Sequence, residues 1–208
     1  MKNAISQAAL QELLTQEQHN AAVKWWGQGS RQLQLIAGAG TGKTFTLTAA
    51  VAAARSEGIC ADSIAVLTFS RRAAHEMQER LKRYNVAVGY VGTIHALAYR
   101  ALRANTQTTG RAQWHLHPET EKLKFTLFKK LFPQYSHIPV SEMPVGKILS
   151  ASESLLWEQE FKQYKVRHNL KDFDDVIREA CYRELLSGRF KIAFVDEFQD
   201  TSPAQLAL

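Results

Sequence analysis

The sequence predicts an α/β fold in which a parallel β-sheet is flanked by helices and carries a small helical insert. Three observations predict it. Short apolar runs of strand length alternate with longer segments of helical periodicity, which is the pattern of βαβ units. A glycine-rich turn lies between the first apolar run and the first helix. A polar, proline-containing stretch over about 105–170 then interrupts the alternation.

The expected elements follow in chain order. Strands are predicted at 33–37, 63–69, 88–91 and 190–195, where apolar residues cluster over four to seven positions. Helices are predicted at 43–55, 71–83, 95–103, 119–132, 153–164 and 172–186. The residues near 105–170 are interpreted as the insert, because they begin with the polar run Asn105–Gly110 and contain four of the five prolines. The sheet is expected to be incomplete.

Composition narrows the class of protein. The chain has 208 residues, enough for one domain with an insert, and no apolar run approaches the roughly 18 residues that cross a bilayer. Two distant cysteines form neither a metal-ligand pattern nor a disulfide framework, which favours a reducing cytoplasm. Residues 1–110 hold 12 Lys and Arg against 6 Asp and Glu, whereas 111–208 hold 14 of each. The excess positive charge lies in the first half of the chain. This charge could form a nucleic-acid-binding surface or simply keep the protein soluble.

The glycine-rich turn has the pattern of a phosphate-binding loop. Eight residues form it: Ala37, Gly38, Ala39, Gly40, Thr41, Gly42, Lys43 and Thr44. Glycines let backbone N–H groups surround phosphate oxygens, and the helix N-terminus that follows favours negative charge. Lys43 is expected to reach the β- and γ-phosphates of ATP, and Thr44 to place its hydroxyl on Mg²⁺. Ala37 occupies a position where the strict pattern has glycine.

A second motif, Asp-Glu-Phe-Gln-Asp at 196–200, follows the last apolar run. Carboxylates at the C-terminal end of a parallel strand face the ligand crevice of such folds. Asp196 is therefore predicted to hold Mg²⁺, and Glu197 to act as general base on the attacking water. An isolated acidic cluster is more often a solvated turn, so the prediction depends on the phosphate-binding loop upstream.

These two motifs together resemble those of the UvrD/Rep-like superfamily 1A DNA helicases. The loop is similar to that family's A-x-x-G-x-G-K-T form of the Walker A motif, and 196–200 is similar to its D-E-x-Q-D element. The resemblance implies a RecA-like ATP-binding domain, ATP and Mg²⁺ as cofactors, and an ATP hydrolase that moves 3′ to 5′ along single-stranded DNA. It places Gln199 with Glu197 and Lys43 among the catalytic residues.

Other segments carry the resemblance further. Leu14–Gln18 resembles the adenine-reading Q motif, which implies that Gln18 contacts ATP. The segments 68–77 and 92–95 resemble motifs Ia and Ib, with Arg71-Arg72 in place of Asn-Lys and Ile94 in place of an aromatic residue. They imply a set of DNA-binding residues: Phe69, Ser70, Arg71, Arg72, Thr93 and His95. Asp172–Asp175 resembles a D-F-D-D segment, interpreted as structural or close to the nucleotide.

The resemblance divides the chain into a RecA-like domain, 1–104 with 171–208, and a reduced 1B-like insert, 105–170. Because the sequence ends at Leu208, before a motif III strand and a second RecA-like domain with arginine fingers, little activity is expected from the chain alone. Three hypotheses stay open. They are a truncated or split helicase, a non-enzymatic ATP- and DNA-binding module completed by a second polypeptide, and an unrelated P-loop kinase or transferase.

Overall fold

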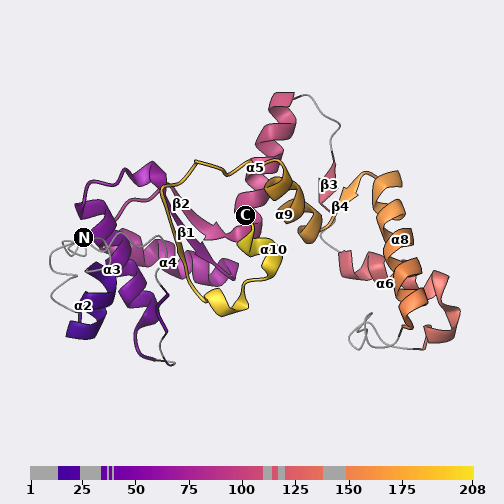
Figure 1. Cartoon of the computed structure of the whole chain (residues 1–208), viewed down its shortest axis with the longest axis horizontal. Coiled ribbons are helices and arrows are strands. Elements are labelled where there is room, and N and C mark those ends of the chain that lie inside the picture. The colour runs from indigo at the N-terminus through magenta and orange to yellow at the C-terminus, as the bar shows by residue number, and fades with distance from the viewer. Residues whose placement is uncertain are drawn as a thin grey trace.

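The computed structural model describes residues 14–23, 34–36, 38, 40–109, 114–116, 120–137 and 149–208. Figure 1 shows the elements in chain order. They are α2 (Gln16–Val23), α3 (Lys43–Ser56), η2 (Ala61–Ser63), β1 (Ile64–Thr68), α4 (Arg71–Arg83), β2 (Tyr90–Thr93), α5 (Ile94–Thr109), β3 (His115–Leu116), α6 (Thr120–Leu131), η3 (Pro133–Tyr135), α8 (Ala151–Arg167), β4 (Leu170–Lys171), α9 (Phe173–Tyr182), β5 (Ile192–Val195), η5 (Phe198–Asp200) and α10 (Pro203–Leu206).

The predicted α/β class is confirmed by a small parallel sheet. Its strand order is β2-β1-β5, and β1 is parallel to both neighbours. Leu67 of β1 is in register with Gly92 of β2 and with Val195 of β5. The carboxyl ends of all three strands therefore meet at one edge, as they must in a parallel sheet built from crossover connections.

Helices cover both faces of this sheet because side chains alternate along β1. Ile64 and Val66 are buried against the alanine-rich helix α3 and against Met77 of α4. Ala65 faces the opposite side, where it packs with Leu97 of α5 and with Tyr90. Helix α2 joins the first of these layers through Ala22. The core thus lies on both sides of the central strand and holds the strand ends in place.

One predicted strand, 33–37, is wrong for the residues that the structure describes. Residues 34–36 carry no strand, and the Ile36 side chain is 85% exposed. Ala37 and residue 33 lie outside the described residues. A strand is stable only when a neighbouring strand takes its hydrogen bonds. In the described residues β5 pairs with β1, and residues 34–36 pair with no strand. Without a pairing strand, nothing stabilises an extended and buried conformation of this apolar run.

Helix α5 runs longer than the prediction of 95–103. The polar residues after 104 continue as helix to Thr109. Two threonine hydroxyls in this part donate to backbone carbonyls one turn earlier: Thr106 to Leu102 and Thr108 to Ala104, both at 2.9 Å. The indole N–H of Trp114 also donates to the Thr106 hydroxyl at 3.3 Å. The polar run Asn105–Gly110 is the expected start of the insert, and its first five residues continue α5.

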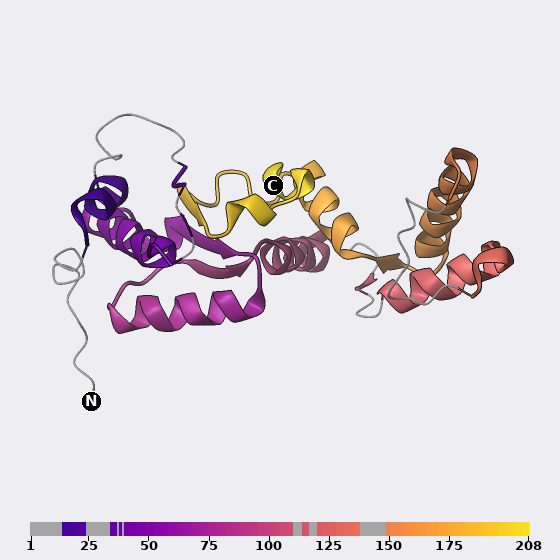
Figure 2. The same cartoon turned by 90° about the horizontal axis from the view of Figure 1, so that it is seen from below.

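The helices α6 and α8 stand at one end of the molecule, away from the sheet (Figure 2). They pack on each other around an aromatic cluster of Phe128, Phe132, Trp157 and Phe161. The short parallel pair β3–β4 joins this part to the rest, with His115 in register with Leu170. Ser150 caps α8 in a capping box with Glu153, which explains why this helix begins at Ala151.

Candidate nucleotide-binding and nucleic-acid-binding site

The glycine-rich loop leads directly into α3. Gly40 and Gly42 have φ angles of 77° and 85°, in the left-handed region that glycine adopts without strain. The Thr41 hydroxyl donates to the Gly38 carbonyl at 2.8 Å and closes the loop, while Thr46 N–H donates to the Gly42 carbonyl at 2.9 Å and begins the helix. This arrangement presents a helix N-terminus with Lys43 and Thr44 in its first turn, which favours anions. Ala37 and Ala39 lie outside the described residues.

Gln18 lies against this loop. Its side-chain amide donates to the Thr41 carbonyl at 3.0 Å, and its amide oxygen accepts from the Thr15 backbone N–H at 3.0 Å. A Cβ on Gly42 would come within 2.7 Å of the Gln18 amide nitrogen, which is the end of a flexible side chain and could move, so the positive φ of Gly42 is what favours glycine there. The structure thus brings the residue predicted to read adenine next to the predicted phosphate loop, although the two are separated by more than twenty positions.

Asp196 stands at the carboxyl end of β5, where its backbone N–H continues the ladder to the Leu67 carbonyl at 2.9 Å. Its carboxylate lies close enough to the Thr44 hydroxyl and to Lys43 for both groups to lower its pKa. Burial and the neighbouring charge of Glu197 raise the pKa of Asp196, and Lys43 and Thr44 oppose that rise. The first turn of α3 and the end of β5 therefore meet, as the two motifs predicted.

A divalent cation fits this junction. The Asp196 carboxylate and the Thr44 hydroxyl are hard oxygen ligands that lie close to each other, so both could bind one small ion. Among the described residues no group of three or more His, Cys, Asp or Glu side chains could hold a metal. Mg²⁺ suits such a sparse site, because it commonly takes one or two protein oxygens together with phosphate oxygens and water.

Glu197 follows in an unusual backbone conformation. Its φ of 53° lies in the left-handed region, which is uncommon for a residue with a Cβ and typical of functional turns. The backbone N–H of Glu197 donates to Asp196 Oδ1 at 3.2 Å, and the Gln199 side-chain amide donates to the Glu197 carboxylate. The hydrogen bond from Gln199 gives the Glu197 carboxylate an orienting partner.

The residues predicted to contact DNA fall into two groups. Phe69 follows β1 and is 59% exposed, and Arg71 and Arg72 lie in the exposed first turn of α4, where Arg72 pairs with Glu76 at 3.0 Å. Ser70 and Thr93 begin helices. The Ser70 hydroxyl accepts from Ala73 N–H at 3.1 Å, and the Thr93 hydroxyl accepts from Ala96 N–H at 3.2 Å. These bonds use oxygen lone pairs and leave the hydroxyl hydrogens as donors.

A small pocket is lined by residues of both predicted sites. Its lining comes from the ends of β1 and β5, the start of α5 and the segment that leads into α10: Thr68, Phe69, Ile94, His95, Val195, Asp196, Thr201 and Gln205. Sequence reasoning missed Thr201 and Gln205. The signal for Gln205 is present as Ser202-Pro203-Ala204-Gln205, a capping-box sequence that predicts a helix start. That signal says nothing about which side chain the Gln205 amide contacts.

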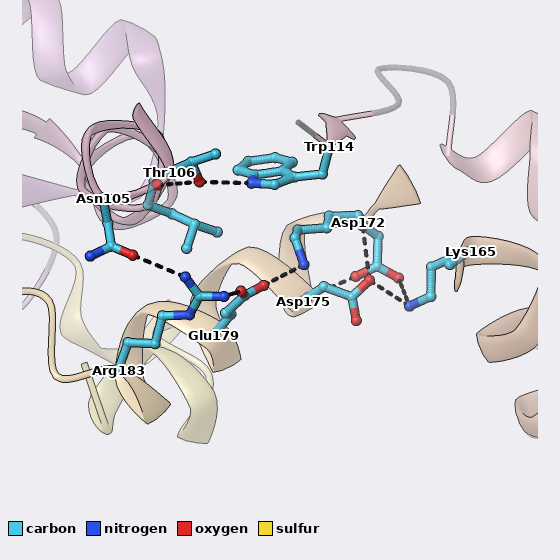
Figure 3. Close-up of polar contacts among 10 residues, drawn as sticks. Asn105, Thr106, Trp114, Lys165, Asp172, Asp175, Glu179 and Arg183 are labelled. Atoms are coloured by element: carbon cyan, nitrogen blue, oxygen red, sulfur yellow. Dashed lines mark hydrogen bonds and ion pairs between the residues drawn. The ribbon is translucent and has the colours of Figure 1, made fainter. Parts of the chain in front are cut away.

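The D-F-D-D segment has a structural role. Asp172 caps α9 in a capping box with Asp175, and Lys165 of α8 pairs with both carboxylates at 2.9 and 2.7 Å (Figure 3). Figure 3 also shows a second set of polar contacts, in which Arg183 pairs with Glu179 and donates to Asn105 of α5. Phe173 points the other way and packs edge-on against the His95 ring, with centroids 5.4 Å apart.

The fold and this site define a P-loop nucleotide-binding α/β protein. A phosphate-type loop opens a helix, and an acidic residue at the end of a parallel strand meets that helix's first turn. Comparison with known proteins identifies the family. Residues 14–154 and 146–208 match the UvrD/REP helicase N-terminal domain, and the chain belongs to this family.

Individual relatives agree with this assignment. The chain is 29% identical to the ATP-dependent DNA helicase UvrD2 of Mycobacterium tuberculosis over 82% of its own length and 31% of the relative's. It is 28% identical to DNA helicase II of Rickettsia typhi over 99% of its length and 36% of the relative's, and 29% identical to the ATP-dependent DNA helicase PcrA of Bacillus subtilis over 85% and 28%. The chain therefore spans about a third of the length of these relatives. In the part of the chain that the structure describes, no helix could cross a membrane.

Proposed function

We propose that this chain is the ATP-binding part of a DNA helicase motor, which binds Mg-ATP at the loop 37–44 and single-stranded DNA beside it. The observation that carries the proposal is the meeting of Lys43, Thr44 and Asp196. A cation, a hydroxyl and a carboxylate converge there at a helix N-terminus, which is the chemistry that a nucleoside triphosphate and its metal need. Membership of the helicase family makes ATP and DNA the ligands to test first.

Each side chain at the site would have its own role in ATP hydrolysis. Thr44 and Asp196 would hold Mg²⁺, which would offset negative charge on the phosphates. Lys43 would bind the β- and γ-phosphates, and Gln18 would read the adenine edge with its amide. Glu197 would accept the proton of the attacking water while Gln199 orients its carboxylate, a role that their hydrogen bond supports. In the full-length arrangement, arginines of a second domain, on this or another polypeptide, would close over the γ-phosphate.

We also propose that the first turn of α4 and the start of α5 contact single-stranded DNA. Arg71 and Arg72 would bind phosphates, helped by the Ser70 and Thr93 hydroxyls, and exposed Phe69 would stack on a base beside His95. Opening and closing of two domains during ATP hydrolysis would then move the protein along single-stranded DNA in the 3′ to 5′ direction. This direction is proposed from family membership.

The division into a RecA-like domain, 1–104 with 171–208, and a 1B-like insert, 105–170, is likewise a proposal. The separate aromatic core between α6 and α8 and the β3–β4 junction support it. Helix α5 crosses the proposed boundary and would connect the two parts rigidly.

Binding measurements with paired variants test the proposal. Isothermal titration with Mg-ATP and anisotropy of a labelled oligothymidylate should both show saturable binding, and DNA affinity should fall steeply with salt because counterions are released. Changing Arg71 and Arg72 to alanine should weaken DNA binding more than changing Lys82 and Arg83, which lie at the opposite end of the same helix and carry the same charge. A folded protein that binds neither ligand would refute the proposal. ATP turnover that is independent of DNA but needs a small phosphate acceptor would favour a kinase or transferase. Turnover only with an added second domain would favour the partner-dependent module.

A further inference from the structure

Tyr90 is the first residue of β2, and its side chain lies along the strand toward the start of α5. The phenol hydroxyl donates to the Thr93 backbone carbonyl at 3.0 Å. The side chain is 7% exposed and packs with Leu97. The Arg100 guanidinium lies over the ring, 5.7 Å from its centroid. One side chain of β2 therefore contacts the residue that precedes α5 and the first two turns of that helix.

Gly92 leaves room for this ring. A Cβ on Gly92 would lie 2.5 Å from the phenol oxygen and 2.8 Å from Cζ of Tyr90. Side chains two positions apart on a strand share a face, so the ring covers the place that a side chain at position 92 would occupy. The ring is buried, and it could not move aside without losing its contacts with α5. Since the φ of Gly92 is not in the left-handed region, the close approach of Tyr90 is what favours glycine here.

The hydrogen bond from Tyr90 holds the peptide that leads into α5. Thr93 also caps this helix, because its hydroxyl accepts from Ala96 N–H at 3.2 Å. The carbonyl of Thr93 is thus held by β2 and its side chain by the helix. Burial raises the pKa of Tyr90 against the opposing charges of Arg100 and Arg189, so the hydroxyl keeps the proton that it donates.

We propose that Tyr90 is a positioning residue that orients Thr93 and His95 for contact with single-stranded DNA, because it holds the Thr93 carbonyl and the start of α5 against β2. This inference rests on the proposed function, in which Thr93 and His95 contact DNA. Tyr90 lies outside the segment 92–95 that resembles motif Ib. It would act through that segment without touching DNA, since its own side chain is buried.

A single peptide reports the hydrogen bond. Thr93-Ile94 is the only Thr-Ile pair in the sequence, so labelling with carbonyl-¹³C threonine and ¹⁵N isoleucine gives one HNCO peak for it. Tyr90→Phe keeps the ring and removes the O–H. The carbonyl ¹³C signal should then move to lower shift, because an accepted hydrogen bond deshields this carbon. Tyr99→Phe makes the same chemical change on α5, where the ring packs on Trp114, and should leave the peak in place. An unmoved peak in Tyr90→Phe, or equal movement in Tyr99→Phe, would overturn the inference.

Thermal unfolding tests the contact between Tyr90 and Gly92 without DNA. Gly92→Ala should lower the midpoint of unfolding, because the added Cβ overlaps the phenol ring. In a Tyr90→Leu background, where that ring is absent, the same change should lower the midpoint much less, as a double-mutant cycle requires of coupled residues. Equal lowering in both backgrounds would show that glycine is needed for another reason and would refute the assigned contact.

Anisotropy of a labelled oligothymidylate tests the connection to DNA. Tyr90→Phe should weaken binding by about 2- to 12-fold, the value of one hydrogen bond. Its affinity for Mg-ATP should stay at the wild-type value, whereas a general loss of folded structure would lower both affinities. Tyr99→Phe should bind both ligands as the wild type does. If Tyr90→Phe bound the oligonucleotide as tightly as a wild type that binds it, the positioning role would be refuted and the proposed function would stand. A wild type that binds no oligonucleotide would refute the proposed function itself and the role of Tyr90 with it.

Discussion

The Thr44 hydroxyl lies close to the Asp196 carboxylate, so the first turn of α3 meets the end of β5. The two residues come from motifs separated by about three quarters of the chain, and neither motif alone determines a site. Their contact brings a hydroxyl and a carboxylate together beside Lys43. The predictions below follow from this junction and from the packing that supports it.

Replacing Lys43 with alanine should weaken Mg-ATP binding by about 10- to 150-fold, because one charge-assisted hydrogen bond to a phosphate is lost. Isothermal titration measures the effect directly. Lys82→Ala, at an exposed position in the last turn of α4, is the matched control and should bind as the wild type does. Equal affinities of Lys43→Ala and the wild type would show that the phosphates bind elsewhere.

Glu197→Gln should leave the affinity for Mg-ATP within a few-fold of the wild-type value and reduce ATP turnover by about 10²- to 10⁴-fold, since an amide cannot accept the proton of water. Phosphate release at saturating Mg-ATP is the measurement. Glu184→Gln is a close control, because Glu184 is exposed and also has a left-handed φ, of 50°. If Glu197→Gln changed the affinity for Mg-ATP and left turnover unchanged, Glu197 would be a binding residue and not the general base.

The Lys165–Asp172 pair predicts a pH dependence of stability. Burial raises the pKa of Asp172, but hydrogen bonds from Lys165 and from the Asp175 backbone, with the charge of Lys165, outweigh it and leave the pKa below its ordinary value. A carboxyl with a lowered folded-state pKa stabilises the fold above its ordinary pKa and loses that contribution as the pH falls through the folded value. Burial lowers the pKa of Lys165, and both aspartates reverse this, so the amine stays charged past its ordinary range.

Asp172→Asn, which preserves the helix cap, should therefore lower the free energy of unfolding by about 1–3 kcal/mol at neutral pH. The difference from the wild type should begin to shrink as the pH falls below about 4, the ordinary pKa of the carboxyl. It should disappear only below the lower folded-state pKa, where the native Asp172 carboxyl also becomes neutral. Thermal unfolding at the two pH values measures it. Asp174→Asn changes the same charge on the exposed side of the same helix turn and should have a smaller effect. A pH-independent difference would mean that packing, not charge, is responsible.

Trp157→Ala should destabilise the part formed by α6 and α8 by about 3–5 kcal/mol, since the ring is buried among Phe128 and Phe161. If the proposed domain division is correct, hydrogen exchange should accelerate in those helices and stay slow in β1 and α3. The exposed neighbour Leu156→Ala should change neither. Uniform loss of protection throughout the chain would indicate a single cooperative unit.

Local sequence was sufficient for several elements. Helix α4 was predicted at 71–83 and occupies Arg71–Arg83, because Ala74, Met77 and Leu81 recur at helical spacing and Ser70 caps the first turn. The glycine-rich loop and the acidic motif were found in the same way. Each depends on residue types within a few positions of one another, and the backbone there has few alternatives.

Longer-range partners decided where the prediction failed. Residues 34–36 have the apolar character of a strand but no ladder in the described residues, so they are exposed. Helix α5 extends to Thr109, and the indole N–H of Trp114 donates to the Thr106 hydroxyl near its end. Both outcomes depend on whether a distant hydrogen-bonding partner is present, which hydrophobic periodicity does not report.

The sequence by itself determined the fold class, the phosphate loop and the acidic motif, since their information lies in short runs of residues. Only the tertiary structure decided that Gln18 rests on Thr41, that Thr44 contacts Asp196 and that Gln205 faces His95. Each of these contacts joins side chains on different elements. Their geometry is set by how parallel strands align at one edge of the sheet and by which helix packs on which face, and neither is encoded in any single segment.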